Sequence, residues 1–233
     1  MSGHDLLAVP FGAQLLQASL TGCNLFYLSP GPHQACAARR GGVPVLFPQF
    51  ATLGPLPKHG FARNQAWSLL HAAAGHLLMR LDISPDGHPG WPHAARLLLE
   101  VVLGDGLRQS LRIENIGRDA FSFTGGLHPY WAVQDVSDCV VEGLPLSGLG
   151  RREVDEWHPG EGEITLCSHA RRLRLTQSGF EGWQVWSPGP DHALRDLPHE
   201  DWRRFLCLEP VIMTPRWLVP GEVFEGVLMA GLI

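Results

Sequence analysis

A histidine and two aromatic residues follow a pair of glycines in the segment Phe121–Asp138, FSFTGGLHPYWAVQDVSD. The imidazole of His128 has an ordinary pKa near neutral pH, which suits a general acid. The neighbouring Tyr130 and Trp131 offer rings on which the C–H face of a sugar can stack. An acid in a sugar-binding site is one interpretation of this segment, and a core histidine at the rim of a sheet is the other.

A glutamate ends the apolar segment Phe205–Val211, FLCLEPV. Carboxylates are rarely buried without a partner or a role. Burial and neighbouring charges would set the pKa of this carboxyl group. Glu209 is therefore a candidate general base, and a glutamate at the rim of a strand is an equally good interpretation of the segment alone.

Two arginines lie in Arg39–Trp67, a stretch too rich in Gly and Pro for a regular strand or helix. Long ordered loops of this kind are often functional. Arg40 precedes two glycines, and Arg63 follows His59 by four residues. Guanidinium groups close to glycines can hold an anion through paired hydrogen bonds. Two surface arginines beside turns would give the same spacing.

Short strands must hold these residues in place. The chain has 27 Gly and 19 Pro, which are spread along its whole length and punctuate short segments. Several segments alternate polar and apolar residues, which is typical of strands with one wet face. We expect strands at Leu15–Leu20, Asn24–Leu28, Ala66–His71, His76–Ile83, Ala95–Leu103, Gly106–Glu114, Ala120–Thr124, Asp138–Val141, Glu163–Cys167, Arg172–Thr176, Trp183–Trp186 and Phe205–Leu208.

The resulting prediction is an all-β fold, an antiparallel sandwich or barrel. Glu200–Arg204 is the best helix candidate and would form a single turn at most. Because no repeat, low-complexity tract or linker interrupts the chain, we expect one domain over residues 1–233.

The composition disfavours several classes of protein. The net charge is −5, whereas nucleic-acid binders usually present a basic face. The cysteines are odd in number, widely spaced and without a CxxC pair, so neither a disulfide framework nor a zinc knuckle is expected. They are Cys23, Cys36, Cys139, Cys167 and Cys207.

The expected location is the cytoplasm, since reduced thiols are the simplest interpretation of these cysteines. Met1–Phe11 lacks the apolar run of a signal peptide, and apolar stretches such as Leu97–Leu103 are too short to span a bilayer. Without an evident exposed apolar stripe, we expect a monomer or weak homodimer that binds a small molecule and neither membrane nor nucleic acid.

Six motifs occur in a fixed order along the chain: RGGVPVLFPQF at Arg40–Phe50, LPKHGFARN at Leu56–Asn64, LRIEN at Leu111–Asn115, LHPYW at Leu127–Trp131, VWSP at Val185–Pro188 and CLEP at Cys207–Pro210. The first two are long and specific. Taken together and in this order, the motifs resemble the hexose-6-phosphate mutarotase branch of the aldose 1-epimerase family, and the resemblance covers most of the chain.

The resemblance implies a galactose mutarotase-like β supersandwich with its site in a concave face, and neither a cofactor nor a metal. It implies an isomerase that interconverts the α and β anomers of a hexose 6-phosphate, such as glucose 6-phosphate. His128 matches the general acid of the family and Glu209 its general base. His59 matches a histidine that contacts the sugar ring, and Arg40 and Arg63 match the arginines that hold the phosphate.

The chain departs from the family pattern at three places. The Glu-Val-Asp-Arg string of the family becomes Glu153–Glu156. In it, Asp155 keeps the substrate-binding carboxylate, and the acidic Glu156 replaces the basic arginine. Glu163 is an alternative source of that carboxylate. The His-Thr-Tyr-Phe string becomes HPYW, and Lys58 occupies a position that is usually neutral.

Three other functions stay open from the sequence. An aldose 1-epimerase for a neutral sugar would need His128 and Glu209 but not the two arginines. A sugar-binding protein without turnover would account for the departures from the family pattern. A His/Glu metal enzyme is the least supported, because the histidines form neither an HxH nor an HExxH pattern.

Overall fold

Three antiparallel sheets make up the computed structural model, which describes residues 5–31 and 37–233. Cys36 and the first four residues of the N-terminal segment lie outside the described residues. Within them, helical structure is limited to three short 3-10 segments, η1 (Ala62–Asn64), η2 (Val136–Asp138) and η3 (His199–Arg204). The prediction of an all-β fold is confirmed, and η3 corresponds to the helix candidate of the sequence.

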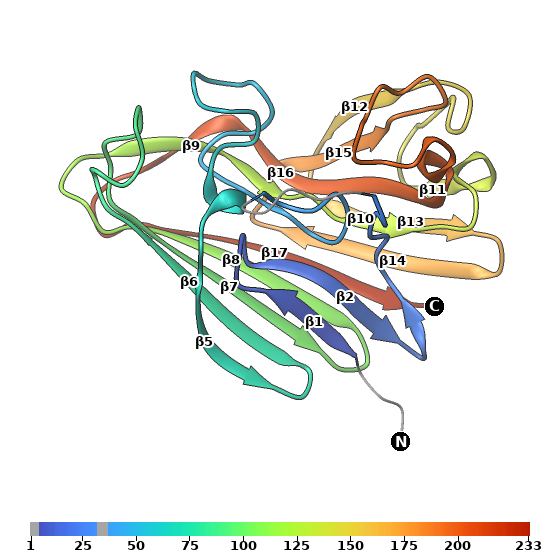
Figure 1. Cartoon of the computed structure of the whole chain (residues 1–233), viewed down its shortest axis with the longest axis horizontal. Coiled ribbons are helices and arrows are strands. Elements are labelled where there is room, and N and C mark those ends of the chain that lie inside the picture. Colours follow the sequence, from blue (N-terminus) through green and yellow to red (C-terminus); the bar gives the residue numbers. More distant parts are fainter. Residues whose placement is uncertain (1–4, 32–36) are drawn as a thin grey trace.

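The six-stranded sheet carries most of the candidate site residues. Its strands run in the order β12 (Val154–Pro159), β15 (Gly182–Ser187), β16 (Phe205–Leu218), β9 (Phe121–Leu127) and β4 (Val45–Leu46), and β10 (Tyr130–Ala132) also pairs with β16. In Figure 1 this sheet forms the upper layer of the molecule.

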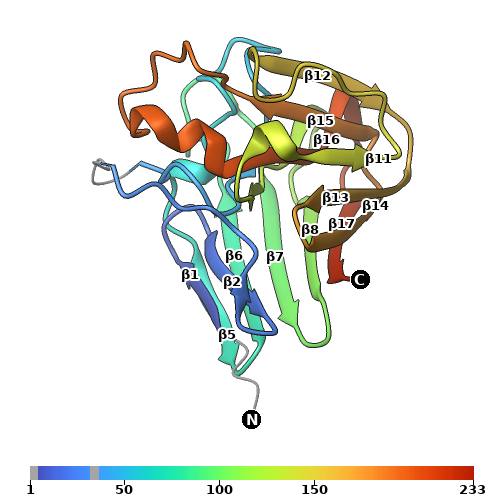
Figure 2. The same ribbon diagram turned by 90° about the vertical axis from the view of Figure 1, so that its right-hand side faces the viewer.

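The eight-stranded sheet lies below it (Figure 1). Its order is β11 (Val140–Glu142), β13 (Gly162–Ser168), β14 (Arg171–Ser178), β17 (Val223–Leu232), β8 (Leu107–Asn115), β7 (Ala95–Leu103), β6 (His76–Ile83) and β5 (Ser68–Ala73). A small third sheet of β1 (Leu6–Val9), β2 (Gln14–Leu20) and β3 (Cys23–Asn24) lies beside the β5–β7 end in both views (Figure 2).

A shared apolar core joins the sheets. Strand β7 alternates between buried and partly exposed side chains, and its buried Leu97 and Leu99 belong to the same core as Leu15 of β2 and Val185 of β15. The other face of the large sheet is wet and carries cross-strand ion pairs, such as Arg96 Nε to Asp82 Oδ1 at 2.8 Å. Alternation of this kind is what the sequence pattern predicts for strands with one wet face.

Strands β1, β4, β10, β12 and β17 are missing from the sequence-based prediction. Two glycines interrupt the apolar pattern of β17, VFEGVLMAGL. At one of them, Gly226, a Cβ atom would overlap the ring of Phe180. The glycine is therefore required by a contact with a residue far away in sequence, and no local rule would place a strand there.

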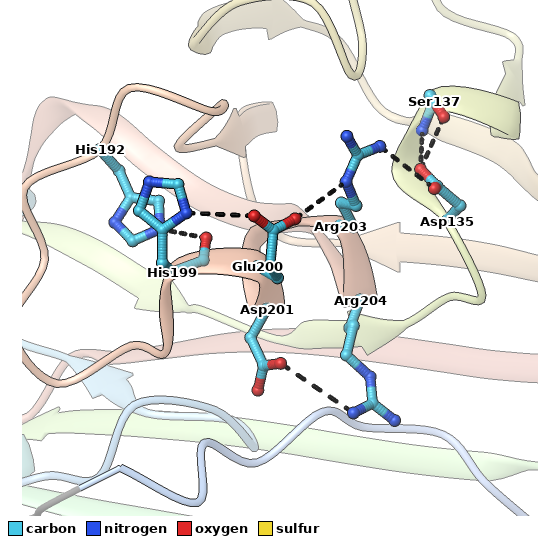
Figure 3. Close-up of polar contacts among 8 residues, drawn as sticks. All are labelled: Asp135, Ser137, His192, His199, Glu200, Asp201, Arg203 and Arg204. Atoms are coloured by element: carbon cyan, nitrogen blue, oxygen red, sulfur yellow. Dashed lines mark hydrogen bonds and ion pairs between the residues drawn. The ribbon is translucent and has the colours of Figure 1, made fainter.

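Polar contacts stabilise η3, the segment that leads into β16 (Figure 3). Arg203 of η3 pairs through Nη1 with Asp135 Oδ2 at 3.3 Å and through Nε with Glu200 Oε2 at 3.5 Å. Asp135 also caps η2 by accepting from the Ser137 N–H at 2.9 Å. Since η2 follows β10 and η3 precedes β16, these contacts help to keep the two strands in register.

None of the helical segments in residues 5–31 and 37–233 has the length and apolar character needed to cross a membrane.

Candidate active site

A cavity of about 310 Å³ opens over the six-stranded sheet. Seven of the eight residues predicted from the sequence line it: Arg40, His59, Arg63, His128, Tyr130, Asp155 and Glu209. They come from segments more than 160 residues apart in the chain, so the fold brings together motifs that the sequence only sets in order.

Trp131 is the exception, and its prediction as a sugar-stacking residue needs correction. Successive side chains of a strand point to opposite faces. On β10, Tyr130 faces the cavity, and Trp131 is 0% exposed in the core, where its Nε1 donates to the Leu208 carbonyl at 3.2 Å. The half-buried Trp186 of β15 supplies an aromatic wall of the cavity instead.

The side chains of His128 and Glu209 face each other at the floor of the cavity. His128 Nδ1 lies 3.4 Å from Glu209 Oε1, and both side chains are buried. Tyr130 pairs with Cys207 in an antiparallel register. His128, two residues before Tyr130, therefore lies opposite Glu209, two residues after Cys207. The backbone N–H of His128 donates to the Pro44 carbonyl at 3.0 Å, which ties it to the RGGVPVLFPQF motif.

Two glycines of β9 let the neighbouring strands come close to this floor. Gly125 and Gly126 have φ angles of 144° and 153°. A Cβ atom at Gly125 would overlap the Leu46 carbonyl of β4, and one at Gly126 would overlap the Pro210 carbonyl of β16. Only glycine fits both the conformation and the space, so the Gly-Gly pair sets the position of His128.

Burial favours the neutral forms of both groups. It raises the pKa of Glu209 well above its usual range, and the negative charge of Asp155 raises this pKa further. Burial likewise lowers the pKa of His128, with further lowering from His59 and Arg63. Glu209 Oε2 and His128 Nδ1 lack hydrogen-bond partners among the described residues, so both groups are available to a ligand.

His59 is held rigidly beside His128, with 5.5 Å between the ring centroids. Its φ angle is 68°, a left-handed conformation that is costly for a residue with a side chain. Two hydrogen bonds with Ala51 maintain it: the His59 N–H donates to the Ala51 carbonyl at 2.9 Å, and His59 Nδ1 accepts from the Ala51 N–H at 3.2 Å.

The protonation state of His59 follows from these contacts. Burial, with the positive charges of Arg63 and Lys58, lowers the pKa of His59 to about 3. The ring is therefore neutral at physiological pH, and because Nδ1 accepts a hydrogen bond, the proton resides on Nε2. His59 can donate one hydrogen bond to a bound ligand.

The two arginines differ in their contacts. Arg63 Nη2 donates to the Lys58 carbonyl at 2.9 Å, and Arg63 Nε is buried without a partner among the described residues. Arg40 Nε donates to Asp196 Oδ1 at 2.8 Å, and Arg40 Nη1 donates to the Tyr130 hydroxyl at 3.2 Å. Arg63 thus presents an unsatisfied cationic donor, which favours an anionic ligand.

Of the two candidates for the substrate-binding carboxylate, Asp155 lines the cavity and Glu163 does not. Asp155 lies on β12 at the rim, where its Oδ1 accepts from Gln184 Nε2 at 2.5 Å. Glu163 lies on β13 in the other sheet, is 53% exposed and pairs with Arg174 at 3.4 Å. The acid that departs from the family pattern, Glu156, pairs with Arg152 Nη2 at 3.1 Å.

Gln184, Trp186 and Asp196 line the cavity but are missing from the predicted site. Gln184 and Trp186 alternate on β15, and Gln184 lies directly opposite Glu209 on β16. The strand prediction for Trp183–Trp186 combined with that register would have found both. Asp196 lies in an irregular segment, and no sequence signal indicates it.

Comparisons with known proteins show the family to which the chain belongs. The family described as "Aldose 1-epimerase" matches residues 6–162, which contain His128 but not Glu209. The chain is 30% identical over 239 residues to a protein of Cenchrus ciliaris named "Putative glucose-6-phosphate 1-epimerase", a match that covers 87% of this chain and 73% of the relative.

A Salmonella typhimurium LT2 protein of the same name is 30% identical over 216 residues, which cover 78% of this chain and 70% of the relative. The crystal structure of a "putative mutarotase" from Salmonella typhimurium superposes with a TM-score of 0.86 at 24% identity, over 97% of this chain and 85% of that one. The fold is therefore that of the mutarotases, and the chain belongs to the aldose 1-epimerase family.

Proposed function

We propose that the protein interconverts the α and β anomers of a hexose 6-phosphate, with glucose 6-phosphate as the first candidate. The facing, buried His128 and Glu209 at the floor of a cavity that also contains two arginines carry the proposal. The names of the two relatives that are 30% identical support the same substrate class.

In the proposed reaction, Glu209 removes the proton of the C1 hydroxyl while His128 gives a proton to the ring oxygen. The bond between C1 and the ring oxygen breaks, and a free aldehyde forms. Rotation about the C1–C2 bond exposes the other face of the aldehyde, and closure reverses both proton transfers. Each transfer contributes about 10²–10⁴-fold in rate.

The electrostatics of the pair suit this cycle. A single proton shared by His128 and Glu209 suffices, because one group loses a proton whenever the other gains one. Ring opening leaves His128 neutral and Glu209 protonated, and those are the forms that burial favours. The buried floor of the cavity therefore stabilises neutral His128 and protonated Glu209, the forms that are present while the sugar ring is open.

The surroundings supply the remaining contacts. His59 Nε2 can donate to a sugar oxygen, and Asp155 can accept from a sugar hydroxyl at the rim. Trp186 offers a ring for the C–H face of the sugar. Arg63, whose Nε has no partner among the described residues, and Arg40 would bind the phosphate.

One observation favours a second function, epimerisation of a neutral aldose. Arg40 already has an ion pair with Asp196, which reduces the positive charge offered to a phosphate. Exchange NMR of the anomeric protons of glucose 6-phosphate and of glucose, each with and without the protein, separates the two functions. Acceleration for the phosphate alone supports our proposal, and equal acceleration for both sugars favours the neutral aldose. No acceleration for either sugar would leave a binding protein without turnover.

A further inference from the structure

The guanidinium of Arg40 is fixed from two sides by groups of the protein itself. Nε donates to Asp196 Oδ1 at 2.8 Å and Nη1 donates to the Tyr130 hydroxyl at 3.2 Å. A guanidinium has several N–H donors in one plane. Two contacts in that plane are enough to orient the group, and the remaining donors stay available to a ligand in the cavity.

Asp196 is itself held in place although it lies in residues 188–198, an irregular segment between β15 and η3. Its backbone carbonyl accepts from the Ser29 hydroxyl at 2.7 Å. The backbone N–H of Ser29 donates to the Arg40 carbonyl at 2.9 Å. Next in sequence, Leu197 is buried in the core. Ser29 therefore connects the backbones of Arg40 and Asp196.

We propose that Asp196 is the positioning residue for Arg40, and that it thereby sets the preference of the site for a phosphorylated over a neutral sugar. This proposal depends on the proposed function in one respect, namely that Arg40 binds the phosphate of the substrate. Asp196 would not contact the sugar ring, so its effect is confined to substrates that carry an anion.

Two opposing effects of the carboxylate have to be weighed. Its negative charge weakens phosphate binding, and its hydrogen bond orients the arginine that binds phosphate. The Asp196 side chain is 43% exposed and that of Arg40 is 18% exposed. Water and salt therefore screen the charge of Asp196, while the orientation of the more buried guanidinium does not depend on screening. We expect orientation to dominate.

Two substitutions separate these effects. Asp196→Asn keeps an acceptor oxygen for Arg40 Nε and removes the charge, and Asp196→Ala removes both. For Asp196→Ala we expect KM for glucose 6-phosphate to rise about tenfold, the usual scale of one charge-assisted hydrogen bond. We expect kcat to stay unchanged, and both constants for glucose to stay unchanged. Asp196→Asn should keep KM near that of the parent protein.

The exposed Asp191 of the same segment provides a matched control. Asp191→Ala removes a carboxylate of equal charge that does not line the cavity, and it should leave all four constants unchanged. Ser29→Ala is a second, milder test, because it removes the hydroxyl that holds the Asp196 carbonyl. It should raise KM for glucose 6-phosphate less than Asp196→Ala does.

Binding of glucose 6-phosphate and of inorganic phosphate, measured by calorimetry, tests the inference independently of turnover. A parent protein that binds both ligands without accelerating anomer exchange would refute the proposed function and leave the role of Asp196 testable. The role of Asp196 is refuted if Asp196→Ala binds both ligands as tightly as the parent. It is also refuted if Asp196→Asn weakens binding as much as Asp196→Ala, or if glucose is affected equally.

Discussion

Replacing Glu209 by Gln is expected to make the protein less active and more stable. Glutamine has nearly the same shape as glutamate but cannot accept the C1 proton. Loss of one proton transfer lowers kcat by about 10²–10⁴-fold, or about 3–5 kcal/mol of activation free energy. The stability should change in the opposite direction, because burial penalises the ionised form of Glu209 and raises its pKa, whereas glutamine has no ionisable group.

The sign of the stability change follows from the raised pKa of Glu209. Between the pKa of the unfolded chain, about 4.3, and the higher folded value, the unfolded state releases a proton that the folded state keeps. Glu209 therefore destabilises the fold increasingly as the pH rises above about 4.3. Within this range each pH unit costs up to about 1.4 kcal/mol of stability.

The assay combines thermal unfolding at pH 4 and pH 8 with anomer exchange by NMR. For a protein of this size, about 1 kcal/mol corresponds to a change of about 2–4 °C in Tm. Glu209→Gln should raise Tm at pH 8 by several times more than at pH 4. Glu163→Gln, on the exposed part of β13, is the matched control and should change neither activity nor Tm.

Two results would refute this reasoning. Full activity in a folded Glu209→Gln protein would show that Glu209 is not the base. A variant that is less stable than the parent at pH 8 would show that the ionised carboxylate stabilises the fold, through its contact with a protonated His128.

Three further predictions concern other parts of the site. Arg63→Ala should raise KM for glucose 6-phosphate about 10–100-fold, the scale of a charge-assisted hydrogen bond. KM for glucose should stay unchanged in the same NMR assay, and equal effects on both sugars would contradict this prediction. His59 is neutral in the fold, with a pKa of about 3, and takes up a proton on unfolding below pH 6.5. The parent should therefore lose about 2–3 kcal/mol more stability than His59→Gln between pH 7 and pH 4.5, measured by urea unfolding, and equal losses would contradict the prediction. Gly125→Ala should lower the free energy of unfolding by about 2–4 kcal/mol, since its Cβ would overlap the Leu46 carbonyl, whereas Gly162→Ala, with no atom nearby, should not.

Much of the fold could be predicted because alternation and turn residues are local signals. The expected strands His76–Ile83 and Ala95–Leu103 coincide with β6 and β7. Strand β16 extends to Leu218, ten residues beyond the expected end at Leu208. Proline cannot donate a ladder hydrogen bond, so Pro210 is a local signal for the end of a strand. Pairing with both β15 and β9 carries the strand past it.

The site was predictable where a motif carries the residue and not where only tertiary contacts place it. His128 and Glu209 each end a recognisable apolar segment, and the cavity contains both. Asp196 is brought to Arg40 by a contact across 156 residues and has no local signature. The error at Trp131 arose because neighbouring residues of one motif were assigned to one face, although strand geometry separates Tyr130 from Trp131.

The place of β17 in the sheet order has a consequence for biosynthesis. β17 follows every other strand in the sequence, yet it lies between β14 and β8 and is the element that joins the two halves of the eight-stranded sheet. While the protein is being translated, strands β5–β8 can pair with one another, and so can β11, β13 and β14, but the two groups cannot become one sheet until the residues of β17 have left the ribosome. The nascent chain therefore exposes the unpaired edge of β8, and later that of β14 as well, until β17 emerges, and such edges favour association with other chains. Slow translation or stalling before Val223 would be expected to promote aggregation of the nascent protein.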